Sequence, residues 1–127
     1  HRDFHAVEVM HSVPSLGFTV QNSGGAFAVS GDTKTNETLW PVLNACDDLK
    51  ILVIEVSFPD EMESLAQDSG HYTPKSLIAD LKRLRHEPAI WLTGMKPGEE
   101  QRIFRKVVKL APDKNFQMLS RGTVLTV

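Results

Sequence analysis

The chain carries a continuous apolar run near its middle, Ile51-Leu52-Val53-Ile54, inside segment 50–58. A run without polar alternation is typical of a central strand that is covered on both faces. Upstream, three further strands are predicted at 4–10, 16–21 and 26–30, with the hairpin turn Asn22-Ser23-Gly24-Gly25 between the last two. The middle run therefore places a β-sheet at the centre of the fold.

Helical patterns alternate with the later strands. Thr73-Pro74 is a typical helix start with Thr73 as the N-cap, and we expect this helix to extend to about residue 85. The sequence also predicts helices at 36–45 and 98–110, a short helix or turn at 59–67, a strand at 89–92, and a closing hairpin over 115–119 and 123–127. This alternation argues for a single layered α/β (α+β) domain over residues 1–127.

Composition excludes several classes of function. The 127 residues are 41% hydrophobic and 24% charged, and the net charge of −2 offers no basic face, so we expect no nucleic-acid partner. Cys46 is the only cysteine, which excludes an internal disulfide and a Cys-based zinc site and favours a reducing, cytoplasmic location. No apolar run approaches the roughly 18 residues of a membrane span, and no signal peptide is visible. We therefore expect no membrane partner.

Two polar segments carry candidate chemistry. Ser30-Gly31-Asp32-Thr33 follows a buried strand, and a carboxylate presented by a glycine turn at a strand end can bridge metal ions. Ser69-Gly70-His71-Tyr72-Thr73-Pro74 places His71 at the mouth of a capped helix, where an imidazole can donate a proton. His11, at the end of the first strand, is a candidate zinc ligand. Each residue also has an ordinary interpretation: Asp32 as a turn residue, His11 as a surface histidine, and His71 as a loop histidine held by local hydrogen bonds.

Glu55 stands inside an apolar strand and therefore needs a partner. One hypothesis is that it orients a metal-ligating histidine from behind. The other is that it forms a structural ion pair or faces solvent. The sequence leaves both open.

Taken together, these segments resemble the C-terminal half of a metallo-β-lactamase-fold phosphodiesterase. Segment 11–18 resembles the one that carries the third-motif His ligand, and segment 30–33 the one that carries the metal-bridging Asp. Segments 54–58 and 69–74 resemble class II cyclic-nucleotide phosphodiesterases. Gly70-His71 followed by Thr73 is also similar to a segment of transfer-RNA 3′-processing endonucleases of the same fold. The resemblance extends from about Phe4 to the end of the chain.

The resemblance implies a fold and a site. The fold is an αββα sandwich of which this chain forms one half. The site holds two divalent ions, zinc or manganese, with His11 and Asp32 as ligands, and acts on a cyclic nucleotide. His71 is the implied proton donor, Thr73 lies near the substrate phosphate, and Glu55 supports a ligand histidine.

The sequence departs from the family pattern at two places, and both bear on whether the chain can bind metal. In Thr93-Gly94-Met95-Lys96-Pro97, Gly94 stands where the family has its last His ligand, and the family's His-x-His-x-Asp-His segment is absent. We therefore expect the chain to be an incomplete or impaired phosphodiesterase that binds metal weakly or not at all. The alternatives are a non-catalytic binding or assembly domain of the same fold and an RNA-processing hydrolase. Half a sandwich leaves an apolar sheet face that needs the missing N-terminal half, a second copy or another protein as partner.

Overall fold

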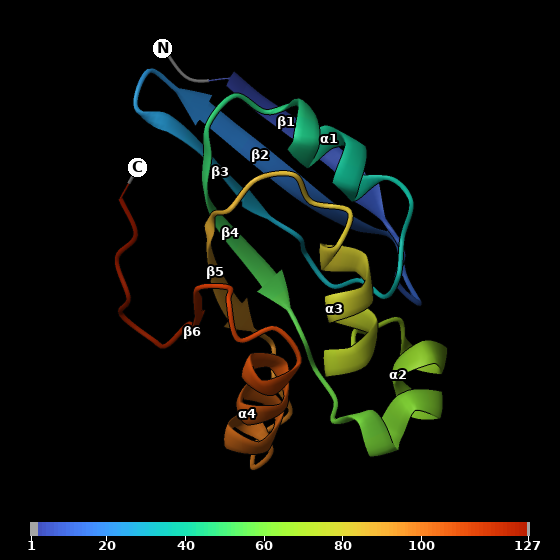
Figure 1. Cartoon of the computed structure of the whole chain (residues 1–127). Helices are drawn as coiled ribbons and strands as arrows, with labels where there is room; N and C mark the ends of the chain where they lie inside the picture. Colours follow the sequence, from blue (N-terminus) through green and yellow to red (C-terminus); the bar gives the residue numbers. More distant parts are fainter. Residues whose placement is uncertain (1–2, 127) are drawn as a thin grey trace.

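The computed structural model describes residues 3–126, which form one six-stranded sheet with helices (Figure 1). The strands are β1 (Asp3–Val9), β2 (Ser15–Asn22), β3 (Gly25–Val29), β4 (Leu49–Glu55), β5 (Ala89–Thr93) and β6 (Phe116–Met118). The helices are α1 (Leu39–Ala45), the 3-10 turn η1 (Asp60–Met62), α2 (Glu63–Ser69), α3 (Pro74–Leu81) and α4 (Glu100–Leu110).

The strands lie in the sheet in their sequence order, β1 to β6. The first three are antiparallel, joined by tight connections, whereas β3, β4, β5 and β6 are parallel and are joined through the helices. Parallel strands bring their carboxyl ends to the same edge. The loops that follow β3, β4 and β5 therefore meet along one edge of the sheet, and this edge holds the site described below.

One face of the sheet is covered by helices. Alternate residues of the central strands point to this face, with Leu52 and Ile54 on β4 and Ile90 and Leu92 on β5, all at most 1% exposed. Side chains of α1, α3 and α4 complete the same core, among them Leu39, Trp40, Leu77, Leu81, Ile103 and Val107. Figure 1 shows these three helices on the same side of the sheet.

The other face of the sheet is also apolar. Phe4, Phe18 and Phe27 form an aromatic row across β1, β2 and β3, with ring centroids 5.4 Å and 6.4 Å apart. Phe4 and Leu16 are 64% and 62% exposed. Farther along, residues 125–126 line a cavity of about 300 Å³ against Ile51, Val53 and their neighbours on β3. The face that we expected to be uncovered is thus open over β1 and β2 and partly covered by the C-terminal segment over β4.

Some sequence predictions were wrong in detail. The closing hairpin is not formed, because β6 pairs in parallel with β5 and residues 123–126 form no strand; residue 127 lies outside the described residues. The helix that begins at Pro74 ends at Leu81 rather than near 85. The predicted helix at 36–45 begins only at Leu39, which places Pro41 in the first turn, where its missing N–H costs nothing. Within residues 3–126, no helix is long and apolar enough to cross a bilayer.

The exposed aromatic row predicts association. We expect the chain to sediment as oligomers that grow with concentration, because Phe4 and Leu16 gain from leaving water. The variant Phe4→Lys/Leu16→Lys should shift the population toward monomer. Leu65→Lys, at a 51% exposed position on α2, is the matched control and should change nothing. A compact monomer of the unmodified chain with a cooperative melt would contradict the prediction.

Candidate functional site

The carboxylate of Glu55 is the centre of the site. It stands at the carboxyl end of β4 and is 1% exposed. Its Oε1 accepts hydrogen bonds from the backbone N–H of Thr33 (3.1 Å) and of Tyr72 (3.3 Å), and its Oε2 accepts one from the hydroxyl of Ser57 (2.9 Å). Burial raises the pKa of the Glu55 carboxyl, and the hydrogen bonds from His71, Ser57 and Thr33 oppose that rise.

His71 is the fourth partner of this carboxylate. Its Nδ1 lies 2.9 Å from Glu55 Oε1 and 3.1 Å from the Ser57 hydroxyl. The hydrogen bond to Glu55 raises the pKa of the His71 imidazole, although burial lowers it. Since Glu55 holds a proton on Nδ1, the other ring nitrogen, Nε2, is left for a ligand or a substrate. The side chain is 20% exposed, so this nitrogen can reach the outside.

His11 is held in the same way by another segment. Its Nδ1 donates a hydrogen bond of 2.7 Å to the carbonyl of Gly70, which holds a proton on Nδ1 and leaves Nε2 as the other contact atom. The two imidazole rings are 4.7 Å apart in an edge-to-face arrangement. Gly70 makes this approach feasible: its φ is 80°, and a Cβ there would come within 2.6 Å of His11 Cα. Any other residue there would have to displace the backbone of His11 and Ser12.

Asp32 lies beside His11 in the loop after β3. Its Oδ2 is 3.9 Å from His11 Nε2, and its side chain is 60% exposed. Gly31 determines the path of this loop, because a Cβ at its φ of 65° would lie 2.4 Å from the carbonyl of Leu16. The structure thus brings His11, Asp32 and His71 together from three separate segments. Their roles as ligands and proton donor remain predictions.

Thr73 and Gly94 also lie at this edge. Thr73 is the N-cap of α3 and is 3% exposed. Its hydroxyl accepts a hydrogen bond from the backbone N–H of Ser76 in a capping box, so this hydroxyl already has a structural role. Gly94 directly follows β5 with a φ of 73°, and a Cβ there would lie 3.5 Å from Glu55 Cβ and 3.6 Å from the Ser57 hydroxyl. A side chain at position 94 would therefore begin next to the Glu55 group at ordinary contact distance.

Ser57 is a site residue that the sequence analysis did not single out. It contacts both Glu55 and His71, and it is 6% exposed. The available signal was its spacing, because side chains two residues apart on an extended strand point to the same side. A serine two positions after a buried glutamate could have been predicted as its hydrogen-bond donor.

His11 and Asp32 could provide part of the coordination shell of a zinc ion, but they do not complete it. His11 Nε2 and the Asp32 carboxylate are the ligand types that zinc prefers, and they are adjacent. Over residues 3–126, however, no group of three or more metal-ligating side chains is placed to hold an ion. Catalytic zinc usually has three protein ligands. His11 and Asp32 alone fall short of that number.

Comparison with known proteins supports the fold. No protein-family model matches the chain, and none of the curated proteins matches it. Several solved structures match, among them unliganded yeast PDE1 with a TM-score of 0.81 and 19% identity, the metallo-beta-lactamase fold protein YhfI from Bacillus subtilis with 0.78 and 14%, and human tRNase Z, short form (ELAC1), with 0.63 and 24%.

The matches cover most of this chain and less than half of each neighbour. They cover 95%, 96% and 74% of this chain, and 44%, 48% and 36% of PDE1, YhfI and tRNase Z respectively. The chain has a mixed α/β architecture that corresponds to part of a metallo-beta-lactamase fold. The expected fold class is therefore confirmed.

The Glu55–His71 pair predicts a pH dependence of stability. The pKa of both groups is raised in the folded state, so the folded chain binds more protons than the unfolded chain. The contribution of His71 is fully present below its ordinary value of 6.5 and is lost as the pH rises through its raised pKa. We expect the free energy of unfolding, measured by urea denaturation, to fall over that window.

The variant Glu55→Gln tests the cause of this dependence. Without the Glu55 carboxylate, burial is opposed only by the smaller attraction from Asp32, and the pKa of His71 should drop in an NMR titration of the imidazole. Ser57→Ala is the control, because it removes a neighbouring hydrogen bond and leaves the carboxylate in place. An unchanged His71 pKa in Glu55→Gln would contradict the assignment.

The incomplete donor set predicts weak metal binding. We expect the isolated chain to retain zinc or manganese well below one ion per chain after dialysis, because His11 and Asp32 provide fewer ligands than a stable site requires. Elemental analysis measures this directly. Retention near one or two ions per chain would show that the described residues suffice.

Proposed function

We propose that this chain provides half of the active site of a metal-dependent phosphodiester hydrolase, with a 3′,5′-cyclic nucleotide as substrate. The observation that carries the proposal is the convergence of His11, Asp32 and His71 at the carboxyl edge of the sheet. Each imidazole is fixed through Nδ1 and presents Nε2. Likeness in fold to yeast PDE1 and the sequence resemblance to class II cyclic-nucleotide phosphodiesterases support it.

In this proposal the three residues have different tasks. His11 Nε2 and the Asp32 carboxylate would hold divalent ions, zinc or manganese. The ions, when bound, supply charge stabilisation for the phosphoryl group and activate water. Thr73 and the N-terminus of α3 add partial positive charge on the side of the phosphate.

His71 is the proton donor to the leaving 3′ oxygen. Glu55 keeps a proton on Nδ1 and raises the pKa of the imidazole, which favours the form that carries a second proton on Nε2. Ser57 fixes the other oxygen of the Glu55 carboxylate and thereby fixes the direction of the histidine. The proposed role of Glu55 is therefore to position His71.

The rest of the ligand shell has to come from a partner. The structural neighbours are about twice as long as this chain, and the open aromatic face over β1 and β2 offers a place for a second sheet. We propose the missing N-terminal half of the same fold as the partner and a second copy as the alternative. The buried single cysteine, Cys46, accords with a reducing, cytoplasmic setting.

Two further functions have specific support. Gly94 and the incomplete donor set favour a non-catalytic binding or assembly domain. The match to human tRNase Z, together with Gly70-His71 before Thr73, favours an RNA-processing hydrolase. A His-x-His-x-Asp-His segment upstream in the reading frame separates the non-catalytic domain from both hydrolases, and cyclic-nucleotide against RNA turnover separates the hydrolases.

The activity test uses the chain assembled with the complementary half. Asp32→Ala should abolish metal-dependent hydrolysis of cyclic AMP, because that carboxylate would be a ligand of the ions. His71→Ala should slow hydrolysis by about 100-fold to 10,000-fold with metal content intact. Joint loss of metal and activity in His71→Ala would make His71 a ligand or a structural residue.

Gly94→His tests the lost ligand position. The imidazole would start beside Glu55 and should raise activity by completing the shell of one ion. The left-handed backbone at φ 73° costs a non-glycine residue roughly 1–2 kcal/mol, so a modest loss of thermal stability should accompany the gain. Gly94→Ala carries the same backbone cost without a ligand and is the control. Equal activity in the two variants would refute the placement of Gly94.

A further inference from the structure

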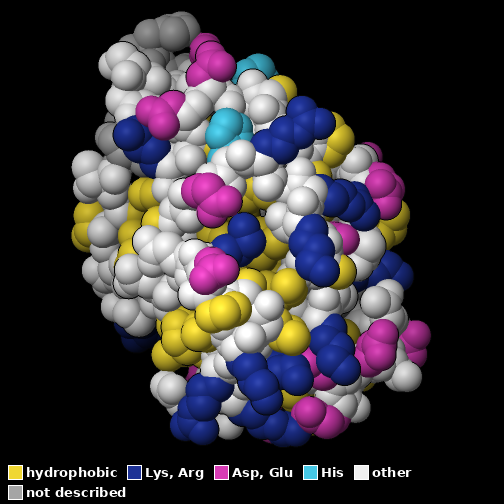
Figure 2. Space-filling view, viewed as in Figure 1, with side chains coloured by type: hydrophobic (Ala, Val, Ile, Leu, Met, Phe, Trp, Pro, Cys, Tyr) yellow, Lys and Arg dark blue, Asp and Glu magenta, His cyan; other side chains and the backbone are white. Residues whose placement is uncertain are grey.

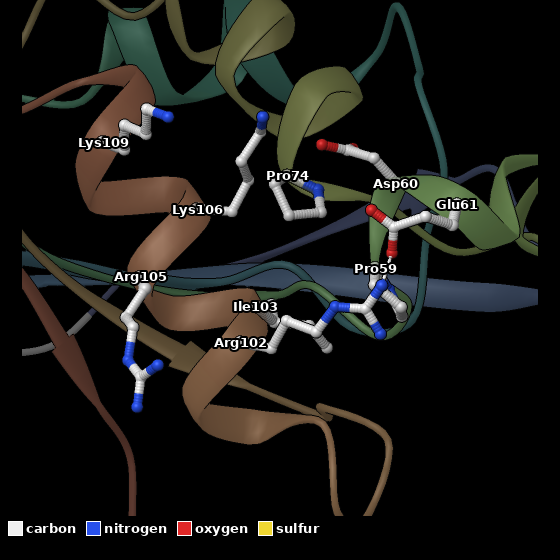
Figure 3. A pocket seen from close by; sticks show the side chains of 9 residues that line it. All are labelled: Pro59, Asp60, Glu61, Pro74, Arg102, Ile103, Arg105, Lys106 and Lys109. Carbon is white, nitrogen blue, oxygen red and sulfur yellow. Dashed lines mark hydrogen bonds and ion pairs between the residues drawn. The ribbon is translucent and has the colours of Figure 1, made fainter.

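A second pocket lies between α4, the start of α3 and η1. Its volume is about 310 Å³, and none of its lining residues belongs to the Glu55–His71 group. Figure 3 shows side chains of α4 on one side and those of η1 and Pro74 on the other. The size falls in the range of about 300–1,000 Å³ that is typical of small-molecule sites.

One wall of the pocket is positively charged. Arg102, Arg105, Lys106 and Lys109 are spaced along one side of α4, and Figure 2 shows Lys and Arg side chains gathered in that lower part of the molecule. Arg102 is neutralised by ion pairs with Glu61 and Glu99. Within residues 3–126, the other three have no ion-pair partner. Unpaired cations around a hollow are suited to a phosphate group.

The rest of the pocket has a different chemistry. Its apolar lining residues are Pro59, Pro74 and, fully buried behind them, Ile103, a lining that suits a flat ring rather than a bare ion. Asp60 Oδ1 accepts a hydrogen bond from the backbone N–H of Lys75 at 3.0 Å, whereas Asp60 Oδ2 is buried with no hydrogen-bond partner. A buried acceptor of this kind needs a donor, which a ligand can supply.

We propose that this pocket binds a nucleoside monophosphate. The phosphate lies against Lys106 and Lys109, the base stacks on the two prolines, and a sugar hydroxyl or exocyclic amine donates to Asp60 Oδ2. Inorganic phosphate would leave the apolar surface and Asp60 unused. A nucleic-acid strand would bring several phosphates close to the carboxylates of Asp60 and Glu61. The inference is independent of the proposed hydrolysis, because the two groups share no residue.

Calorimetric titration of the chain with three probes tests the proposal: 5′-AMP, inorganic phosphate and adenosine. We expect 5′-AMP to bind more tightly than either fragment. Lys106→Gln/Lys109→Gln should weaken 5′-AMP at least about tenfold and leave adenosine unchanged. Asp60→Asn should weaken adenosine and 5′-AMP together. Lys50→Gln/Lys82→Gln removes the same charge outside the pocket and should change affinity by less than about twofold.

Three outcomes would overturn the proposal. One is that 5′-AMP binds no more tightly than inorganic phosphate. Another is that Lys50→Gln/Lys82→Gln loses as much affinity as the pocket variant, which would mean attraction by net charge alone. The third comes from the unmodified chain and needs no variant: the methyl signals of Ile103 should shift in NMR when 5′-AMP is added, and unchanged signals would exclude this pocket.

Discussion

The buried carboxylate of Glu55 is the interaction on which the edge of the sheet depends. A carboxylate withdrawn from water is costly unless hydrogen bonds replace the lost hydration. Here the donors are the backbone of Thr33 and Tyr72 and the side chains of Ser57 and His71. They belong to the loop after β3, the continuation of β4 and the turn before α3. A single buried carboxyl group thus connects three loops, and the candidate site is formed by those loops.

The sequence predicted the elements whose signals are local. The apolar run 51–54 identified β4, and Thr73-Pro74 identified the capped start of α3, because both patterns follow from neighbouring residues. The prediction of a closing hairpin was wrong because the pairing of this segment is not local. Residues 116–118 pair in parallel with β5 across an intervening helix, and the strand contains no mark of that distant partner. Turn residues at 121–122 indicated a bend and could not indicate what followed it.

The site residues were also predictable where the signal is local and not where it depends on distant contacts. The motifs identified His11, Asp32 and His71, and the fold then placed them together. Ser57 could be predicted as a donor to Glu55 from its spacing, but Thr33, His71 and Tyr72 could not, because they lie 16 to 22 positions away. The pocket along α4 was missed for a related reason. Its cations are interspersed with apolar residues in the sequence, and only the helical turn and the adjacent prolines gather them around one hollow.

The backbone at Gly94 makes mutation at this position asymmetric. With a φ of 73°, the position accepts glycine from any predecessor without steric cost. The reverse step returns a β-carbon to a left-handed conformation that disfavours it. Any side chain introduced at position 94 therefore carries a backbone cost that glycine does not. A ligand at this edge is easier to introduce at a neighbouring residue with an ordinary backbone conformation than at position 94 itself.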